Sequence, residues 1–148
     1  MTDEFRFDHV AISVPDINAA EAFYAGALGL AEKSRKTWAA GDARMDAILG
    51  LTNSAGKKLL LTDGRVDLEI WEFTAPLEAV EARARRVSEH GITHFGLQVR
   101  DIATTIKRLS SAGFTLHTEP TLGPTGNWAT YGRDPFGNVI ELVQPPAY

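Results

Sequence analysis

The sequence predicts an α+β fold made of two βαβββ modules in a pseudo-twofold arrangement, and an internal duplication carries this prediction. Residues 8–30 (DHVAISVPDINAAEAFYAGALGL) align with residues 93–116 (THFGLQVRDIATTIKRLSSAGFTL), so that His9 falls on His94. In each copy a segment of alternating side chains, typical of a strand, precedes a segment with helical spacing. We therefore expect each half of the chain to begin with a strand that is followed by a helix.

The ends of the two halves also match. The segment VDLEIWEF (66–73) resembles NVIELVQP (138–145), which pairs Glu69 with Glu141. Two copies of so long a period do not make a solenoid, and duplication of one unit explains the pattern better.

The matches also predict the domain organisation. We expect modules at about residues 5–74 and 92–146 within a single domain spanning 1–148. The segment between them, about 75–91, contains the charge-rich run EAVEARARRVSEH and is expected to form a linker helix. A chain of 148 residues suits one domain, or two small halves that share a core.

Local signals place the elements of each module. Asp16 and Asp101 each follow a predicted strand and precede a helical pattern, as N-cap residues do. The predicted helices run over 17–28 and 102–109, and a glycine follows each of them. Two or three strands are expected after each helix, and those in 32–56 are not placed individually.

A hairpin is expected near the end of the first module. Segments 58–62 and 65–73 flank Asp63-Gly64, a dipeptide that favours tight turns. In the second module the turn PFGN (135–138) precedes the matching strand 139–143.

Composition excludes several classes of protein. The chain is 44% hydrophobic and 23% charged, has a formal net charge of -4 and contains no cysteine. It therefore does not resemble a disordered chain, and it has neither a disulfide framework nor a thiolate site. The mild acidity argues against a nucleic-acid partner, and no stretch approaches the roughly 18 apolar residues of a membrane span. We expect a cytoplasmic protein that binds a small molecule and has no membrane partner.

The strand alternation sets the two histidines on unusual faces. His9 and His94 each begin a predicted strand whose opposite face is apolar. The histidine-bearing faces carry small or polar residues instead, namely Ala11, Ser13, Gly96 and Gln98. Such residues fill a core poorly and suit a cavity.

The repeated His and Glu residues together predict a metal site. A single histidine or glutamate in a strand is more often structural, but here each recurs at matching places, and Glu69 and Glu141 have apolar neighbours. A buried, unpaired carboxylate costs several kcal/mol, so two of them call for a compensating cation. Two imidazoles and two carboxylates suit Zn, Ni, Co, Mn or Fe rather than Ca or Mg.

The chain resembles the vicinal oxygen chelate (VOC) superfamily, which includes glyoxalase I, methylmalonyl-CoA epimerase, extradiol dioxygenases and bleomycin- or fosfomycin-resistance proteins. The motifs FDHVAISVPDINAAEAFYAGALGL, HFGLQVRDI and YGRDPFGNVIELVQP carry the resemblance over nearly the whole chain, apart from the region around 32–56. It implies a curved mixed sheet around a metal-binding cleft, with His9, Glu69, His94 and Glu141 as the metal ligands. It also implies a homodimer.

The resemblance implies a metal-dependent lyase or isomerase of the glyoxalase-like type. Such an enzyme chelates vicinal oxygens of a small substrate and stabilises an enolate or oxyanion, with Glu141 or Glu69 as the general base. Two alternatives remain open. One is an Fe(II) extradiol dioxygenase, although the superfamily's dioxygenases use two histidines and one carboxylate and have no ligand at the position of Glu69, so the presence of Glu69 disfavours oxygen chemistry. The other is a non-catalytic protein that sequesters a ligand, as bleomycin-resistance proteins do.

The chain departs from the named activities of the superfamily. Glyoxalase I has an arginine where this chain has Ser13. It also has an asparagine after its first glutamate ligand, where this chain has Trp71-Glu72. Methylmalonyl-CoA epimerases have paired histidines where this chain has Thr93-His94. The resemblance therefore implies a reaction class rather than one substrate.

Strand faces and aromatic residues suggest a substrate pocket. Each aromatic residue taken alone is more often a core residue. The candidate pocket residues are Trp71, Phe73, Trp38, Met45, Trp128, Ser13 and Gln98.

Overall fold

The computed structural model describes residues 7–77 and 86–146, and the chain divides into two compact units, 1–80 and 81–148. Each unit is described by itself. The core of the expected linker helix, residues 78–85, lies outside the described residues; beyond it, residues 86–91 form turns and bends rather than helix. In the described parts of the chain no helix combines the length and the hydropathy of a membrane span.

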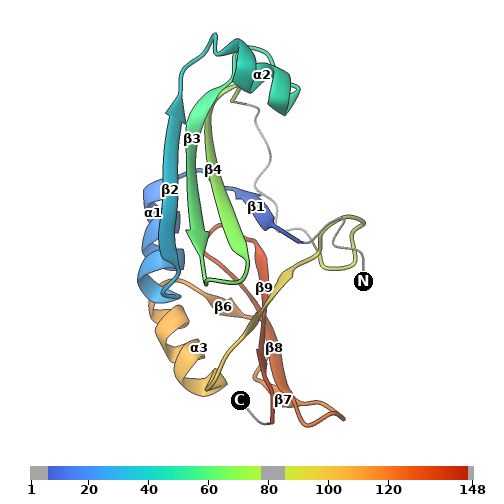
Figure 1. Cartoon of the computed structure of the whole chain (residues 1–148). Helices are drawn as coiled ribbons and strands as arrows, with labels where there is room; N and C mark the ends of the chain where they lie inside the picture. Colours follow the sequence, from blue (N-terminus) through green and yellow to red (C-terminus); the bar gives the residue numbers. More distant parts are fainter. Residues whose placement is uncertain (1–6, 78–85, 147–148) are drawn as a thin grey trace, which may run out of the picture. The chain divides into compact units, whose positions relative to one another are not determined.

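The first unit is a four-stranded mixed sheet with helices (Figure 1). The strands lie in the order β1-β4-β3-β2; β1 pairs with β4 in parallel, and the other neighbours are antiparallel. Its elements are β1 (His9–Ser13), α1 (Ile17–Glu21), η1 (Ala22–Ala27), β2 (Ala31–Trp38), α2 (Ala43–Leu49), β3 (Ala55–Thr62) and β4 (Asp67–Ala75).

The second unit repeats this topology with one strand divided. The sheet order is β5-β9-β8-β6, with β5 parallel to β9, and β7 also pairs with β8. Because β9 occupies one edge of β8, the two short strands β6 and β7 share the other edge and together take the place that β2 has in the first unit. Its elements are β5 (Phe95–Gln98), α3 (Ile102–Ser111), β6 (Thr115–Leu116), β7 (Thr121–Leu122), β8 (Trp128–Arg133) and β9 (Val139–Gln144).

The predicted helix caps are confirmed. The Asp16 carboxylate accepts hydrogen bonds from two backbone N–H groups at the start of α1, and Asp101 accepts one from Thr104 at the start of α3. The first helix widens after Glu21 into the π-helix η1, in which the Leu28 N–H donates to the Phe23 carbonyl, five residues back.

A second repeated contact fastens each helix to the last strand of its unit. The Ile17 N–H donates to Glu72 Oε2 (2.8 Å), and the Ile102 N–H donates to Gln144 Oε1 (2.7 Å). Glu72 and Gln144 stand at the same distance along the sequence from Glu69 and Glu141. The duplication thus preserves a tertiary hydrogen bond, with a glutamate oxygen as the acceptor in one copy and a glutamine oxygen in the other.

Two local features differ from the sequence prediction. Residues 63–66 form a four-residue connection between β3 and β4 rather than a two-residue tight turn, and within it the Asp63 carboxylate accepts hydrogen bonds from the N–H groups of Arg65 and Val66. Between α1 and β3 lie β2, which fits the predicted βαβββ order, and the helix α2, which that order lacks; α2 is capped by Asp42 and ends at Gly50 with φ of 66°.

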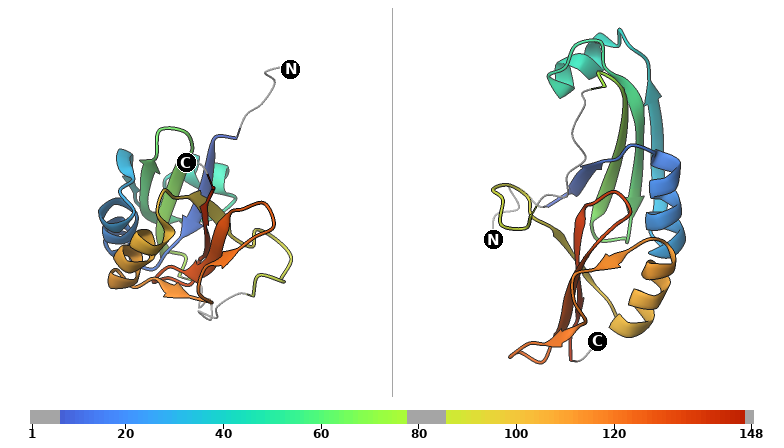
Figure 2. Two further views of the ribbon diagram at one scale, coloured as in Figure 1. Left: turned by 90° about the horizontal axis from the view of Figure 1, so that it is seen from below. Right: turned by 180° about the vertical axis from the view of Figure 1, so that it is seen from behind.

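The hydrophobic core of the first unit lies under α1, on one face of the sheet (Figure 2). Leu59 pairs with Ile70 and Leu61 with Leu68 across β3 and β4, and all four side chains are buried. Because side chains alternate along a strand, the intervening residues Lys58, Leu60, Glu69, Trp71 and Phe73 share the opposite face.

Candidate functional site

The same strand register brings a histidine to a glutamate in each unit. In the first unit Ala11 lies opposite Glu69, and in the second Gly96 lies opposite Glu141. Each of these small residues follows the histidine by two positions, so the histidine side chain and the carboxylate share one face of the sheet. A Cβ atom added at Gly96 would lie 3.5 Å from Glu141 Oε2, which shows how closely the carboxylate approaches the neighbouring strand.

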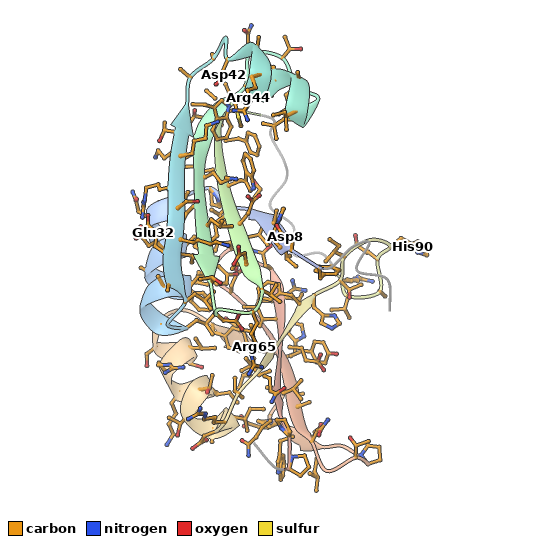
Figure 3. All side chains as sticks on the ribbon, in the orientation of Figure 1. Asp8, Glu32, Asp42, Arg44, Arg65 and His90 are labelled. Atoms are coloured by element: carbon orange, nitrogen blue, oxygen red, sulfur yellow. The ribbon has the colours of Figure 1, made fainter. Side chains whose placement is uncertain are left out.

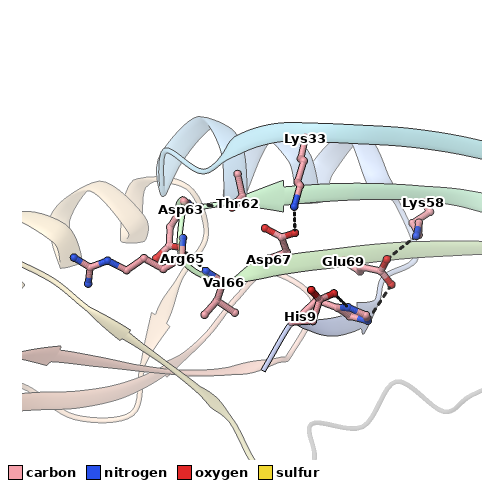
Figure 4. A network of polar contacts seen from close by, with 11 residues as sticks. His9, Lys33, Lys58, Thr62, Asp63, Arg65, Val66, Asp67 and Glu69 are labelled. Atoms are coloured by element: carbon pink, nitrogen blue, oxygen red, sulfur yellow. Dashed lines mark hydrogen bonds and ion pairs between the residues drawn. The ribbon is translucent and has the colours of Figure 1, made fainter. Parts of the chain in front are cut away.

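The first pair joins His9 to Glu69 (Figure 4). His9 Nε2 lies 3.6 Å from Glu69 Oε2, and the Glu69 side chain is only 10% exposed. On the other side of the ring, Nδ1 lies 3.0 Å from Oδ2 of Asp8, the residue labelled beside β1 in Figure 3. A carboxylate oxygen can only accept, so Nδ1–H donates to Asp8 and leaves Nε2 turned toward Glu69.

The second pair has the same arrangement. His94 Nε2 lies 3.5 Å from Glu141 Oε2, and Nδ1 is 2.8 Å from the Thr93 hydroxyl. The Tyr131 ring packs edge-on against His94 with centroids 5.1 Å apart. Burial, together with the hydrogen bond of its hydroxyl to Glu141, raises the pKa of Tyr131, which therefore remains a neutral donor at physiological pH.

The two pairs have the chemistry of metal ligands. Two donor atoms bound to one ion at about 2.0–2.2 Å lie roughly 3–3.6 Å apart, which matches both N–O separations. Each imidazole also has a partner at Nδ1, as metal-ligating histidines usually have. No group of three or more His, Cys, Asp or Glu side chains placed to hold a metal occurs within 7–77 and 86–146. The convergence of all four residues on one ion stays a prediction.

A lysine that the sequence reasoning missed completes the first pair. Lys58 Nζ lies 2.5 Å from Glu69 Oε1 and 5.2 Å from the centre of the Trp71 ring. The Trp71 indole N–H donates to the other oxygen, Oε2, at 3.1 Å. The compensating charge predicted for buried Glu69 is thus supplied within the protein, by Lys58. The only signal in the sequence is a charged residue within the apolar strand KKLLL.

Tyr131 is the second residue that the sequence reasoning missed. It lies directly opposite Glu141 in the β8–β9 ladder. It belongs to the motif YGRDPFGNVIEL, so the motif contained it, but only the strand pairing reveals its contact with Glu141.

A hollow of about 350 Å³ opens beside Glu69 in the first unit. Trp71 and Phe73 stack in parallel along it, with ring centroids 5.8 Å apart. Of the predicted pocket residues, Ser13, Trp71 and Phe73 line the hollow directly. Its full lining is Ala11, Ile12, Ser13, Leu49, Glu69, Trp71 and Phe73.

Trp38 supports this aromatic wall from behind. It is buried and packs edge-on against both Trp71 (5.5 Å) and Phe73 (5.7 Å). Its indole N–H donates to the buried Ser54 hydroxyl, which donates in turn to Asp46 in α2. Hydrogen bonds from Ser54 and Asn53 lower the pKa of Asp46.

The other predicted pocket residues have separate surroundings. Met45 is buried in α2, with its sulfur 3.0 Å from Lys36 Nζ. Trp128, which is 42% exposed, lines a different hollow of about 370 Å³ within the second unit, beside Glu119. Gln98 is exposed at the end of β5. Of the seven predicted pocket residues, therefore, the structure groups Ser13, Trp71 and Phe73 around the first hollow, with Trp38 directly behind them.

Asp67, on the same strand face as Glu69, forms an ion pair with Lys33 at 2.6 Å (Figure 4). The hydrogen bond from Lys33, supported by one from Thr62, lowers the pKa of Asp67. The two charges neutralise each other at the edge of the site.

The repeated strand–helix units, with the histidine and glutamate at equivalent positions, agree with the comparison to protein families. The family model described as Glyoxalase/Bleomycin resistance protein/Dioxygenase superfamily matches residues 6–142. The chain belongs to this superfamily.

The chain is similar to several known proteins, of which three illustrate the range. A 2-epi-5-epi-valiolone epimerase from Actinomyces sp. is 27% identical over 150 aligned positions, which cover 94% of this chain and 79% of that protein. A glyoxalase family protein from Bacillus cereus has a related structure, with a TM-score of 0.86, 23% identity and 97% of each chain covered. A lactoylglutathione lyase from Agrobacterium tumefaciens gives a TM-score of 0.58 at 22% identity, over 97% of this chain and 96% of that one. The two structures support the fold.

Proposed function

We propose that this protein is a divalent-metal-dependent lyase or isomerase that acts on a small organic substrate with two adjacent oxygen atoms. The observation that carries the proposal is the repetition of one His–Glu pair, with N–O separations of 3.6 and 3.5 Å. Each histidine also has a polar partner at Nδ1, Asp8 in the first unit and Thr93 in the second, as metal-ligating histidines usually have. We propose that His9, Glu69, His94 and Glu141 are the ligands, and that the metal is Zn, Ni, Co, Mn or Fe.

A divalent cation held by these residues would offset the negative charge that develops on the substrate oxygens and would acidify the neighbouring C–H bond. We assign proton removal from that carbon to Glu141, whose side chain is 24% exposed and whose bonded partner is the neutral phenol of Tyr131. Glu69 is the less accessible base, because Lys58 and Trp71 hold its two oxygens. Similarity to a protein named as an epimerase supports the isomerase form of the proposal.

The aromatic hollow supports a second candidate, a non-catalytic protein that sequesters an aromatic ligand. The stacked rings of Trp71 and Phe73, backed by Trp38, offer a flat apolar surface on which an aromatic ligand can stack. A third candidate, an Fe(II) extradiol dioxygenase, is tested by oxygen uptake with Fe(II) and catechols. Rapid uptake would favour it over the lyase or isomerase.

Metal analysis of protein purified without chelator or an affinity-tag metal tests the proposal. We expect about one metal ion for the two His–Glu pairs together in the native protein. We expect this ion to be lost in the double variant His9→Ala, His94→Ala. The chain has four histidines, so the double variant His90→Ala, His117→Ala removes the same number and is the matched control. Metal-free native protein that binds aromatic ligands tightly would overturn the enzyme proposal in favour of sequestration.

A further inference from the structure

Lys58 gives the two His–Glu pairs different charges. Its ammonium group contacts Glu69 Oε1, while Glu69 Oε2 faces His9 and accepts from the Trp71 indole. The lysine therefore holds the carboxylate oxygen that is turned away from the histidine. Oε2 remains directed at the position where a ligand shared with His9 would lie.

The second unit has no equivalent of this lysine at the corresponding position. In the β3–β4 ladder Lys58 lies opposite Trp71, two residues beyond Glu69. In the β8–β9 ladder the corresponding position opposite Val143 is Ala129. Glu141 instead accepts a hydrogen bond from the Tyr131 hydroxyl, which carries no charge. The duplication has kept the ligands and has made their surroundings electrostatically unequal.

Two other sets of charges lie near this pair in the described part of the first unit, the Lys33–Asp67 ion pair and Asp8. Lys33 and Asp67 form a closed pair at 2.6 Å. Asp8 lies on the far side of the His9 ring and its side chain is 72% exposed, so water screens its charge. Lys58, by contrast, is 26% exposed and packs over the Trp71 face beside the hollow, where screening is weaker.

We propose that Lys58 makes the site selective for anionic substrates at the cost of metal affinity. This inference rests on the proposed metal-dependent function. A divalent cation with Glu69 and Glu141 is formally neutral, and Lys58 raises the local charge to about +1. The preferred substrate is therefore a small monoanion, such as a 2-hydroxy or 2-oxo carboxylate that presents vicinal oxygens. Lys58 acts as a positioning residue, through its charge and its hold on Glu69 Oε1.

The test compares Lys58→Met with native protein in two binding measurements. The first is Ni²⁺ affinity by isothermal titration calorimetry. The second is binding of lactate to the Ni²⁺-loaded protein, compared with lactamide, its neutral analogue. We expect Lys58→Met to bind Ni²⁺ on the order of tenfold more tightly and lactate on the order of tenfold more weakly, with lactamide unchanged. Lys58→Arg should restore both values toward native.

Opposite changes in one variant separate this role from a structural one, since a misfolded site would lose both affinities together. Lys57→Met is the matched control, because Lys57 is adjacent but pairs with Glu72 at 2.9 Å on the other face of the sheet. It should alter neither measurement. Equal losses for lactate and lactamide, or unchanged Ni²⁺ affinity in Lys58→Met, would overturn the inference while leaving the metal site intact. A native protein that binds no metal would overturn the proposed function, and this inference with it.

Discussion

Gly56 is the position in β3 where the smallest change should have a large effect on the aromatic wall. A Cβ atom built there would lie 2.4 Å from the Glu72 carbonyl oxygen and 2.7 Å from Trp38 Cη2. Ordinary contacts to a Cβ begin near 3.4 Å, so the β4 backbone would have to retreat by about 1 Å. Neither neighbour moves easily, because the carbonyl belongs to a central strand and Trp38 is wedged between Trp71 and Ser54.

We expect Gly56→Ala to lower the free energy of unfolding by about 2–3 kcal/mol, as overpacking of a well-filled site does. Urea unfolding followed by tryptophan fluorescence measures this loss, and near-UV circular dichroism reports the displacement of Trp38. The control is Gly26→Ala, where no atom lies within 4 Å of the added Cβ. Because Gly26 lies in the helical segment η1, that substitution should stabilise the protein by about 0.5–1 kcal/mol. A loss below about 1 kcal/mol for Gly56→Ala would refute the argument from crowding.

Two further variants test the supports of the site. Asp46→Asn should have a lower free energy of unfolding than the native protein at neutral pH, and this difference should shrink in acid. Hydrogen bonds lower the folded-state pKa of Asp46, so its carboxylate stabilises the fold above the ordinary value of 3.8. This stabilisation is lost as the pH falls through the folded-state pKa. Chemical unfolding of both proteins from neutral pH to about pH 3 measures the difference, and a deficit that grows in acid would contradict the hydrogen-bond account. Gln144→Ala removes the acceptor of the Ile102 N–H and should lower the free energy of unfolding in urea by about 1 kcal/mol. Slower unfolding of this variant would contradict the proposed contact.

The local elements could be predicted because their signals are local. Asp16 and Asp101 cap helices through their own side chains and the next turn of backbone, so adjacent residues suffice to identify them. The same holds for the alternation around His9 and His94, which placed the histidines on the polar strand faces. The wider turn at 63–66 escaped prediction because a dipeptide signal says nothing about the hydrogen bonds that the Asp63 side chain then forms.

The contacts of the glutamates depend on strands that are distant in the sequence. Tyr131 meets Glu141 only because β8 and β9 pair in one register, and a shift by one residue would turn it to the other face. Lys58 reaches Glu69 diagonally across the β3–β4 ladder, and no periodicity marks such a contact.

The duplication, the two His–Glu sets and the apolar strand faces follow from the residue order, since repeats and periodicity are properties of the chain alone. How each carboxylate is compensated follows from contacts in space: Glu69 contacts the Lys58 cation and Glu141 the Tyr131 phenol. The reason is that the cost of burying a charge depends on what surrounds it in space, and strand register sets those surroundings.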